Sequence, residues 1–131
     1  MPGSLVSSGI KLADAVDHAG AATYTGTGVN VGRPGAVRVE MTTAALTGAT
    51  STFDVEIQGS EDDSTYVSLG RFARFVETDD SETHYLDVYC PYKWMRYVAI
   101  NGGASTPTIN DLTLTVNEPS YKRTKTDNAG S

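Results

Sequence analysis

Apolar and polar residues alternate along several stretches of the chain, and a period of two predicts strands with one buried and one solvated face. The alternation is clearest over residues 37–41, 53–58, 85–89 and 112–117. Such clean alternation favours antiparallel sheets, because parallel strands that are covered on both faces read as continuous apolar runs. The pattern predicts strands near residues 21–31, 36–43, 52–58, 65–69, 71–76, 84–90, 94–100 and 111–117.

The segments between these stretches are rich in the residues that form turns. Gly, Asp, Asn, Ser and Pro gather in residues 32–36, 46–51, 59–64, 77–82 and 101–107. About eight short strands with turns between them predict an all-β protein, a single antiparallel β-sandwich with a jelly-roll-like strand order. Only residues 10–15 have the pattern of a short helical turn.

The chain divides into three parts by composition. Residues 1–20 are expected to form an N-terminal arm that packs on the sheet, or a first strand that pairs with a neighbouring subunit. Residues 21–118 are expected to form the β-sandwich domain. Residues 119–131 lack apolar periodicity and carry Lys122, Arg123 and Lys125. This tail is expected to be flexible, and it is either a solvated end or a basic segment that docks on an acidic partner.

Length and charge exclude several classes of protein. A chain of 131 residues has the size of one domain. Its 16 acidic and 10 basic residues give a net charge of −6, which argues against a partner that is duplex DNA or RNA. No apolar run is long enough to span a bilayer, so no membrane partner is expected. The first residues lack the basic and apolar regions of a secretory signal, so we expect a soluble domain made inside the cell.

Two turns collect carboxylates, and oxygen ligands from neighbouring loops are the ligands that Ca²⁺ prefers. The first contains Glu61, Asp62 and Asp63, and the second contains Asp79, Asp80 and Glu82. Their spacing matches no calcium-loop signature, and Asp is common in hairpin turns because it bonds its own backbone. We therefore expect structural turns and no metal site, with a cation site as the alternative.

No arrangement of residues in the sequence predicts catalysis. His18 and His84 lie far apart, no nucleophile motif accompanies either, and His84 is expected on a solvated face. Cys90 has no basic neighbour in sequence and is expected to be a buried, inert thiol. No phosphate-binding loop is present. We expect no enzymatic activity and no cofactor.

Aromatic residues are concentrated in residues 85–97. A period of two places Trp94, Arg96, Val98 and Ile100 on one face of their strand. Exposed Tyr, Trp and Arg are typical of protein interfaces, and they can also stack sugars or bases, whereas buried ones only fill the core. The candidate interface residues, including the basic tail, are Tyr89, Tyr92, Trp94, Arg96, Lys122, Arg123 and Lys125.

Two segments carry a resemblance to a known family. They are FDVEIQGSEDDSTYVSLGRF at residues 53–72 and YCPYKWMRYVAINGGASTPTINDLTLTV at residues 89–116. Their order of Asp-rich turn, Leu-Gly step, Arg-Tyr-Val strand and Gly-Thr-Pro loop resembles the small cement, or decoration, proteins on capsids of tailed bacteriophages.

The resemblance implies a non-enzymatic virion structural protein that is made in the bacterial cytoplasm and sits on the capsid surface. It would bind the major capsid protein across shell subunits and stabilise the shell. Association with itself, as a dimer or trimer, is also expected, because the edge strands of a small sandwich must be covered.

The alternative is a carbohydrate-binding β-sandwich module on a phage particle. Residues 59–66 are similar to a turn of the discoidin-type binders. Ser64 and Tyr66 stand where that family has Gly and Trp, and the family's terminal cysteines are missing here.

Overall fold

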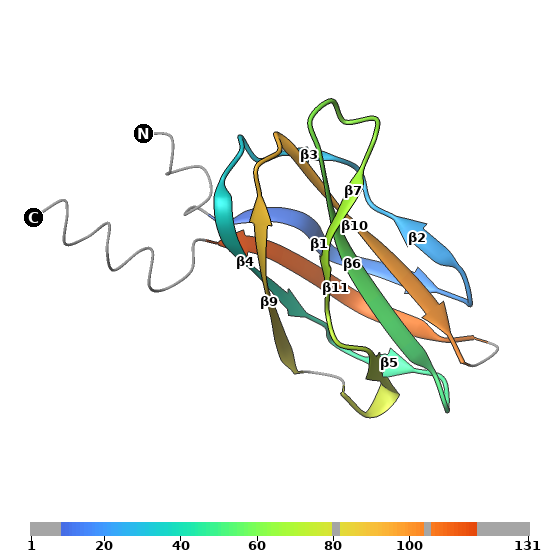
Figure 1. Cartoon of the computed structure of the whole chain (residues 1–131). Coiled ribbons are helices and arrows are strands. Elements are labelled where there is room, and N and C mark those ends of the chain that lie inside the picture. The colour runs from blue at the N-terminus through green and yellow to red at the C-terminus, as the bar shows by residue number, and fades with distance from the viewer. Residues whose placement is uncertain (1–8, 80–81, 104–105, 118–131) are drawn as a thin grey trace, which may run out of the picture.

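The computed structural model describes residues 9–79, 82–103 and 106–117, which form two antiparallel β-sheets packed face to face (Figure 1). The predicted β-sandwich is therefore confirmed. The one helical element among these residues is the short 3₁₀ turn η1 (Glu77–Asp79). No helix in the described ranges is long and apolar enough to cross a bilayer.

The order of the strands is that of a jelly roll. The first sheet, sheet A, runs β1 (Ile10–Ala19), β11 (Thr108–Asn117), β4 (Gly35–Thr42) and β9 (Thr83–Cys90), with β5 (Leu46–Thr47) also pairing β11. The second, sheet B, runs β2 (Thr23–Thr25), β10 (Trp94–Gly102), β6 (Thr52–Ser60) and β7 (Val67–Arg71), with β3 (Val29–Asn30) pairing β10 and β8 (Phe75–Val76) pairing β6. Without the two-residue strands, each sheet has four strands in the interleaved order of a jelly roll.

The core lies between the sheets and is built from the alternating apolar positions. The inward side chains of β4, β6, β10 and β11 are almost all fully buried, because each strand has a neighbour on both sides and a sheet above it. Burying these side chains contributes most of the favourable free energy of folding. The largest are Phe53, Phe75, Met41, Ile57, Met95, Ile109, Leu112 and Leu114.

The N-terminal part of the chain differs from the expected helical turn. Residues 10–15 belong to β1, which pairs with β11 of the same chain. The strand does not alternate cleanly because its register with β11 shifts three times. Ala15 has φ 53° and Asp111, on the facing strand, has φ 55°, a conformation that marks a bulge in such a ladder.

Each sheet ends in two edge strands. Sheet A ends in β1 and β9, and sheet B ends in the β2–β3 segment and the β7–β8 segment. Strand β7 packs over β9, and a side chain at Gly70 would come within 3.0 Å of Cγ1 of Val88. The sandwich is therefore closed at this edge by close contact between the two sheets.

Candidate binding surfaces

The candidate interface residues do not form one surface. Tyr89 projects outward from β9 of sheet A, because its neighbours Val88 and Cys90 point into the core. Trp94 and Arg96 project outward from β10 of sheet B, because Met95 and Tyr97 are buried. The turn between β9 and β10 changes sheets, so the two groups lie on opposite faces of the sandwich.

Tyr92 lies in this turn and packs at the margin of the core. A Cβ atom at Gly59 would come within 2.8 Å of the Tyr92 ring, so the ring rests directly on the backbone of β6. The basic tail residues Lys122, Arg123 and Lys125 lie outside the described residues.

An apolar strip runs along the outer face of sheet B. Trp94 and Ile100 are partly exposed at the two ends of β10. Between them, Arg96 is partly exposed and Val98 is buried, with 8% of its surface exposed. Cross-strand neighbours of the strip are polar, with Asn30 and Ser60 opposite Trp94. An apolar centre with polar surroundings is the usual composition of a protein interface.

Arg96 lies within this strip, between Trp94 and Val98, and two neighbouring side chains hold it. Its Nε donates to Oε1 of Gln58 at 2.7 Å, and its guanidinium lies 3.9 Å from the centre of the Tyr66 ring. The Tyr66 hydroxyl donates to Oδ1 of Asp63. Burial first, and the Asp63 carboxylate second, raise the pKa of Tyr66 to about 12, so the phenol stays neutral. Arg96 thereby connects β10 to the β6–β7 turn.

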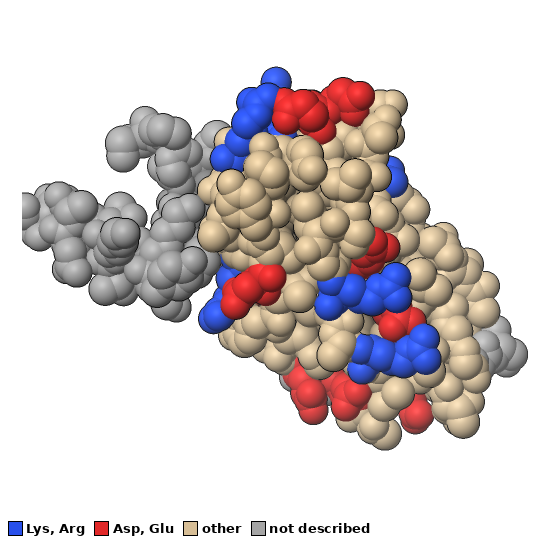
Figure 2. Space-filling model, viewed as in Figure 1, with Lys and Arg blue, Asp and Glu red and all other residues tan. Residues whose placement is uncertain are grey.

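Two further arginines lie on the same face, each paired with an acidic residue. Nη2 of Arg74 lies 2.9 Å from Oδ2 of Asp54, and Arg71 lies 3.8 Å from Glu56. Figure 2 shows basic and acidic side chains alternating on this side of the molecule. Arg71 and Arg74 are thus paired with acidic residues, whereas Arg96 contacts the uncharged Gln58 and Tyr66.

The outer face of sheet A carries exposed tyrosines on its edge strand. Tyr85 is 58% exposed and Tyr89 is 68% exposed. Between them, Asp87 accepts two hydrogen bonds from Arg38 on β4, at 2.8 and 3.1 Å. These bonds lower the pKa of Asp87. Cζ of Arg38 also lies 5.5 Å from the centre of the Tyr85 ring, and this cation–π contact favours one position of the Tyr85 side chain.

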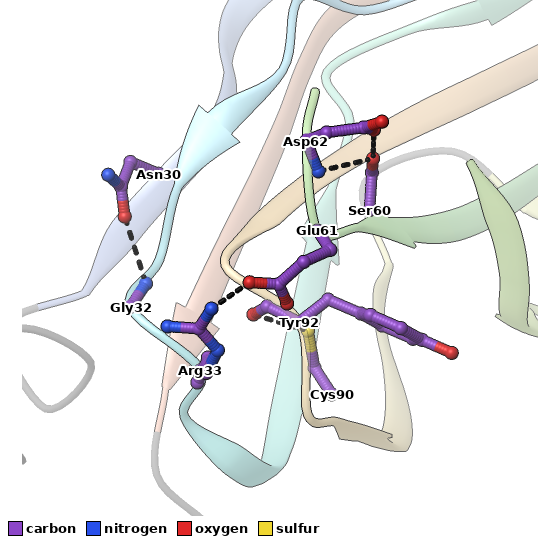
Figure 3. Close-up of polar contacts among 8 residues, drawn as sticks. All are labelled: Asn30, Gly32, Arg33, Ser60, Glu61, Asp62, Cys90 and Tyr92. Atoms are coloured by element: carbon purple, nitrogen blue, oxygen red, sulfur yellow. Dashed lines mark hydrogen bonds and ion pairs between the residues drawn. The ribbon is translucent and has the colours of Figure 1, made fainter. Parts of the chain in front are cut away.

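Asp62 and Asp79 bond groups within or next to their own turns, whereas Asp80 lies outside the described residues. Glu61 pairs with Arg33, and Asp62 bonds with Ser60 (Figure 3). Oδ1 of Asp62 also accepts from the backbone N–H groups of Ser64 and Thr65, at 3.0 Å each. Together with the Ser60 hydroxyl, these bonds lower the pKa of Asp62. Asp79 accepts from the N–H of Val76. Among the residues described, no three potential metal ligands come together.

His18 belongs to a small polar cluster at the edge opposite β9. Its Nε2 lies 2.8 Å from the Tyr97 hydroxyl, and its ring stacks on Tyr24 with centroids 4.4 Å apart. Burial lowers the pKa of His18, and the nearby Asp17 opposes this effect. A groove of about 400 Å³ opens beside the cluster, between β1 and the β2–β3 segment. The two sheets thus separate at this edge.

The second histidine and the cysteine both face inward. His84 lies on the inner side of β9 and stacks on Phe75, with ring centroids 5.4 Å apart. The expectation of a solvated face for His84 is therefore wrong. Cys90 is fully buried, as expected, and burial raises the pKa of its thiol.

Sequence reasoning missed the residues that hold the candidate surfaces in place. Tyr66, Gln58 and Arg38 act across strands, and pairs such as Gln58 with Arg96 are 38 positions apart in sequence. For Gln58 and Arg38 the available signal was their outward position in the alternating pattern of their strands, and Tyr66 lies in the β6–β7 turn, where no such pattern exists.

Comparisons with known proteins support the fold. Neither a family model nor a curated protein matches this sequence. The PBSX exported protein XepA is similar in structure, with a TM-score of 0.57 and 12% identity over 88% of this chain and 39% of that chain. A solved structure with the CBM22-1 and GH10 modules of the Clostridium thermocellum xylanase Xyn10B has a TM-score of 0.43 and 12% identity, over 86% of this chain and 29% of that chain. The chain thus spans less than half the length of either protein, and at this identity the XepA match shows the fold alone.

Proposed function

We propose that the protein is a non-enzymatic structural protein of a phage particle that binds the capsid across shell subunits and stabilises it. The observation that carries the proposal is the strip of Trp94, Val98 and Ile100 on the outer face of sheet B. Its aromatic anchor, polar surroundings and fixed Arg96 are the features of a protein-binding surface. The sequence resemblance to decoration proteins and the fold shared with the PBSX protein XepA support the phage context.

A rigid sandwich suits this role. Arg96 is held by Gln58 and Tyr66 before any partner arrives, so little side-chain entropy is lost on binding. A protein that binds only the assembled shell stabilises it by mass action. Many copies on one particle also turn a modest affinity into a large total effect. Lys122, Arg123 and Lys125 would add a contribution that falls as salt concentration rises.

The test compares phage particles that carry the protein with particles from which its gene has been deleted. We expect the deleted particles to lose their genome at lower temperature, and purified protein to restore the resistance. Trp94→Ala is expected to weaken binding to undecorated shells by at least about tenfold, because truncating an aromatic anchor costs about 2 kcal/mol or more. Thr115→Ala is the control, since Thr115 lies on the outer face of β11 in sheet A, away from both the strip and β9.

A loss of shell binding in Trp94→Ala could also result from destabilisation of the domain. Thermal unfolding of the free variant checks this, and Ile100→Ala provides a second truncation at the other end of the strip. Shells that neither bind the protein nor change in robustness without it would overturn the proposal. Binding of the same purified protein to a glycan array would then favour the carbohydrate-binding alternative.

A further inference from the structure

We propose that two copies of this chain associate through the free edge of β9, which pairs antiparallel with β9 of the second copy. The inference is separate from the proposed function, because it rests on a different part of the molecule and is tested without a capsid.

The backbone of β9 offers an unprotected edge. Within the described part of the chain it pairs with β4 alone, over all eight residues from Thr83 to Cys90 and without a register shift. A long, regular edge strand presents unpaired N–H and C=O groups that can bond another strand. Strand β7 contacts the side of β9 that carries Leu86 and Val88, whereas Tyr85, Asp87 and Tyr89 point to the other side.

The opposite side of the sandwich is poorly suited to such pairing. Strand β1 has three register shifts, and Ala15 lies at a bulge with φ 53°. Strands β2 and β3 have only three and two residues. Bulges and short strands are the usual means by which an edge avoids pairing.

The exposed apolar side chains gather on the same side as β9. Among the described residues, the large apolar or aromatic side chains that are exposed are Val67, Tyr85 and Tyr89, at 44%, 58% and 68%. Val67 is on β7 and the tyrosines are on β9, and these two strands contact each other. This side of the sandwich therefore combines free backbone groups with exposed apolar surface, which is the composition expected where a partner binds.

The outward side chains of β9 identify the partner as a second copy. The outward row is Thr83, Tyr85, Asp87 and Tyr89, and a two-fold axis through the edge sets this row against the same row of a second copy in antiparallel order. A two-fold axis at Leu86 and one at Asp87 give overlaps of equal length, and we choose the axis at Leu86 because an axis at Asp87 would set the two Asp87 carboxylates against each other. It places Tyr85 opposite Asp87 of the second copy, and Thr83 opposite Tyr89 of the second copy.

The charges fit this register. The two Asp87 carboxylates do not face each other, and each is already bonded to Arg38 of its own chain. The pairing therefore buries no uncompensated charge of the outer row. Aromatic residues opposite β-branched ones, as Tyr89 is opposite Thr83, stabilise cross-strand pairs.

Analytical ultracentrifugation of the full chain over ~1–100 μM tests the proposal, since mass action makes dimerisation concentration-dependent. We expect the natural protein to form a dimer. The double variant T83E/Y89E places like charges opposite each other at two points and is expected to weaken association by at least about tenfold.

The matched variant T83E/Y89K separates pairing from folding. Both positions are exposed and face uncharged residues of β4, namely Thr42 and Ala36, so the two variants should fold alike. In the proposed register, T83E/Y89K places opposite charges together and is expected to restore the dimer. A monomer at every concentration, a trimer, or a dimer that responds equally to both variants would overturn the proposal. Circular dichroism confirms that each variant is folded.

Discussion

At the scale of single residues, the period-2 pattern predicted which face of a strand each side chain points to better than it predicted what that side chain packs against. It placed Trp94 and Arg96 on one face and Met95 on the other, as the structure has them. It did not predict that His84 packs against Phe75, because that contact joins strands from different sheets. Alternation tells which side chains share a face, and only the pairing of distant segments decides what covers that face.

His18 gives a pH-dependent prediction at this scale. Burial lowers its pKa below the ordinary value of 6.5, so the unfolded chain binds the proton more readily than the folded chain. The contribution of His18 to the free energy of unfolding is therefore fully present above pH 6.5, the ordinary pKa of histidine. It is lost as the pH falls through the lowered pKa of the folded state. We expect the free energy of unfolding in urea to fall between about pH 7.5 and about pH 5.5.

His18→Gln is the control for this measurement. Glutamine cannot titrate in this range, so the variant should show a smaller fall in stability over the same interval. The two proteins differ at this one position, so the difference between them reports on His18. An equal fall in both proteins would contradict the assignment to His18.

At the scale of elements, the sequence predicted the long strands well and their interruptions poorly. Strands β4, β6, β9, β10 and β11 lie close to the expected ranges. Strand β1 was not expected in this form, because bulges break the alternation that would reveal it. The continuous strand expected over residues 21–31 is instead β2 and β3, which pair with β10 at separate places.

Gly26, between β2 and β3, is predicted to be intolerant of a side chain. Its N–H donates to the carbonyl oxygen of Tyr97 at 2.9 Å, and a Cβ atom there would overlap the Tyr97 ring. That ring is only 5% exposed and cannot move aside easily. We expect Gly26→Ala to lower the free energy of unfolding by about 1–3 kcal/mol, as overpacking does, measured by chemical denaturation.

Gly102→Ala is the matched control, at the end of β10. The nearest atom to its added methyl group would be Oγ1 of Thr52, at 3.5 Å, which is an ordinary contact. Stability should stay within about 0.5 kcal/mol of the natural protein. Equal losses in the two variants would show that space around Gly26 is not what limits substitution.

At the scale of the whole molecule, the jelly-roll order separates the surfaces that the sequence places together. Tyr89 and Trp94 are five positions apart in the chain and lie on opposite faces of the sandwich. The proposed shell contact on sheet B and the proposed self-association through β9 can therefore operate at the same time. Sequence alone could not separate them, because the assignment of β9 and β10 to different sheets depends on pairings with β4 and β6.

The pairing of β1 with β11 also determines how the domain responds to mechanical force. Ile10, at the start of β1, lies opposite Val116, near the end of β11. Pulling these two positions apart loads the ladder in unzipping geometry, so that the hydrogen bonds between β1 and β11 break one pair at a time. Pulling Ile10 against Thr108, which pairs at the far end of the ladder, loads all the bonds together in shear. Optical-tweezer measurements should give the lower unfolding force for the first pair of attachment points, and equal forces would contradict this. A load applied at Ile10 and Val116 would therefore separate β1 from β11 first.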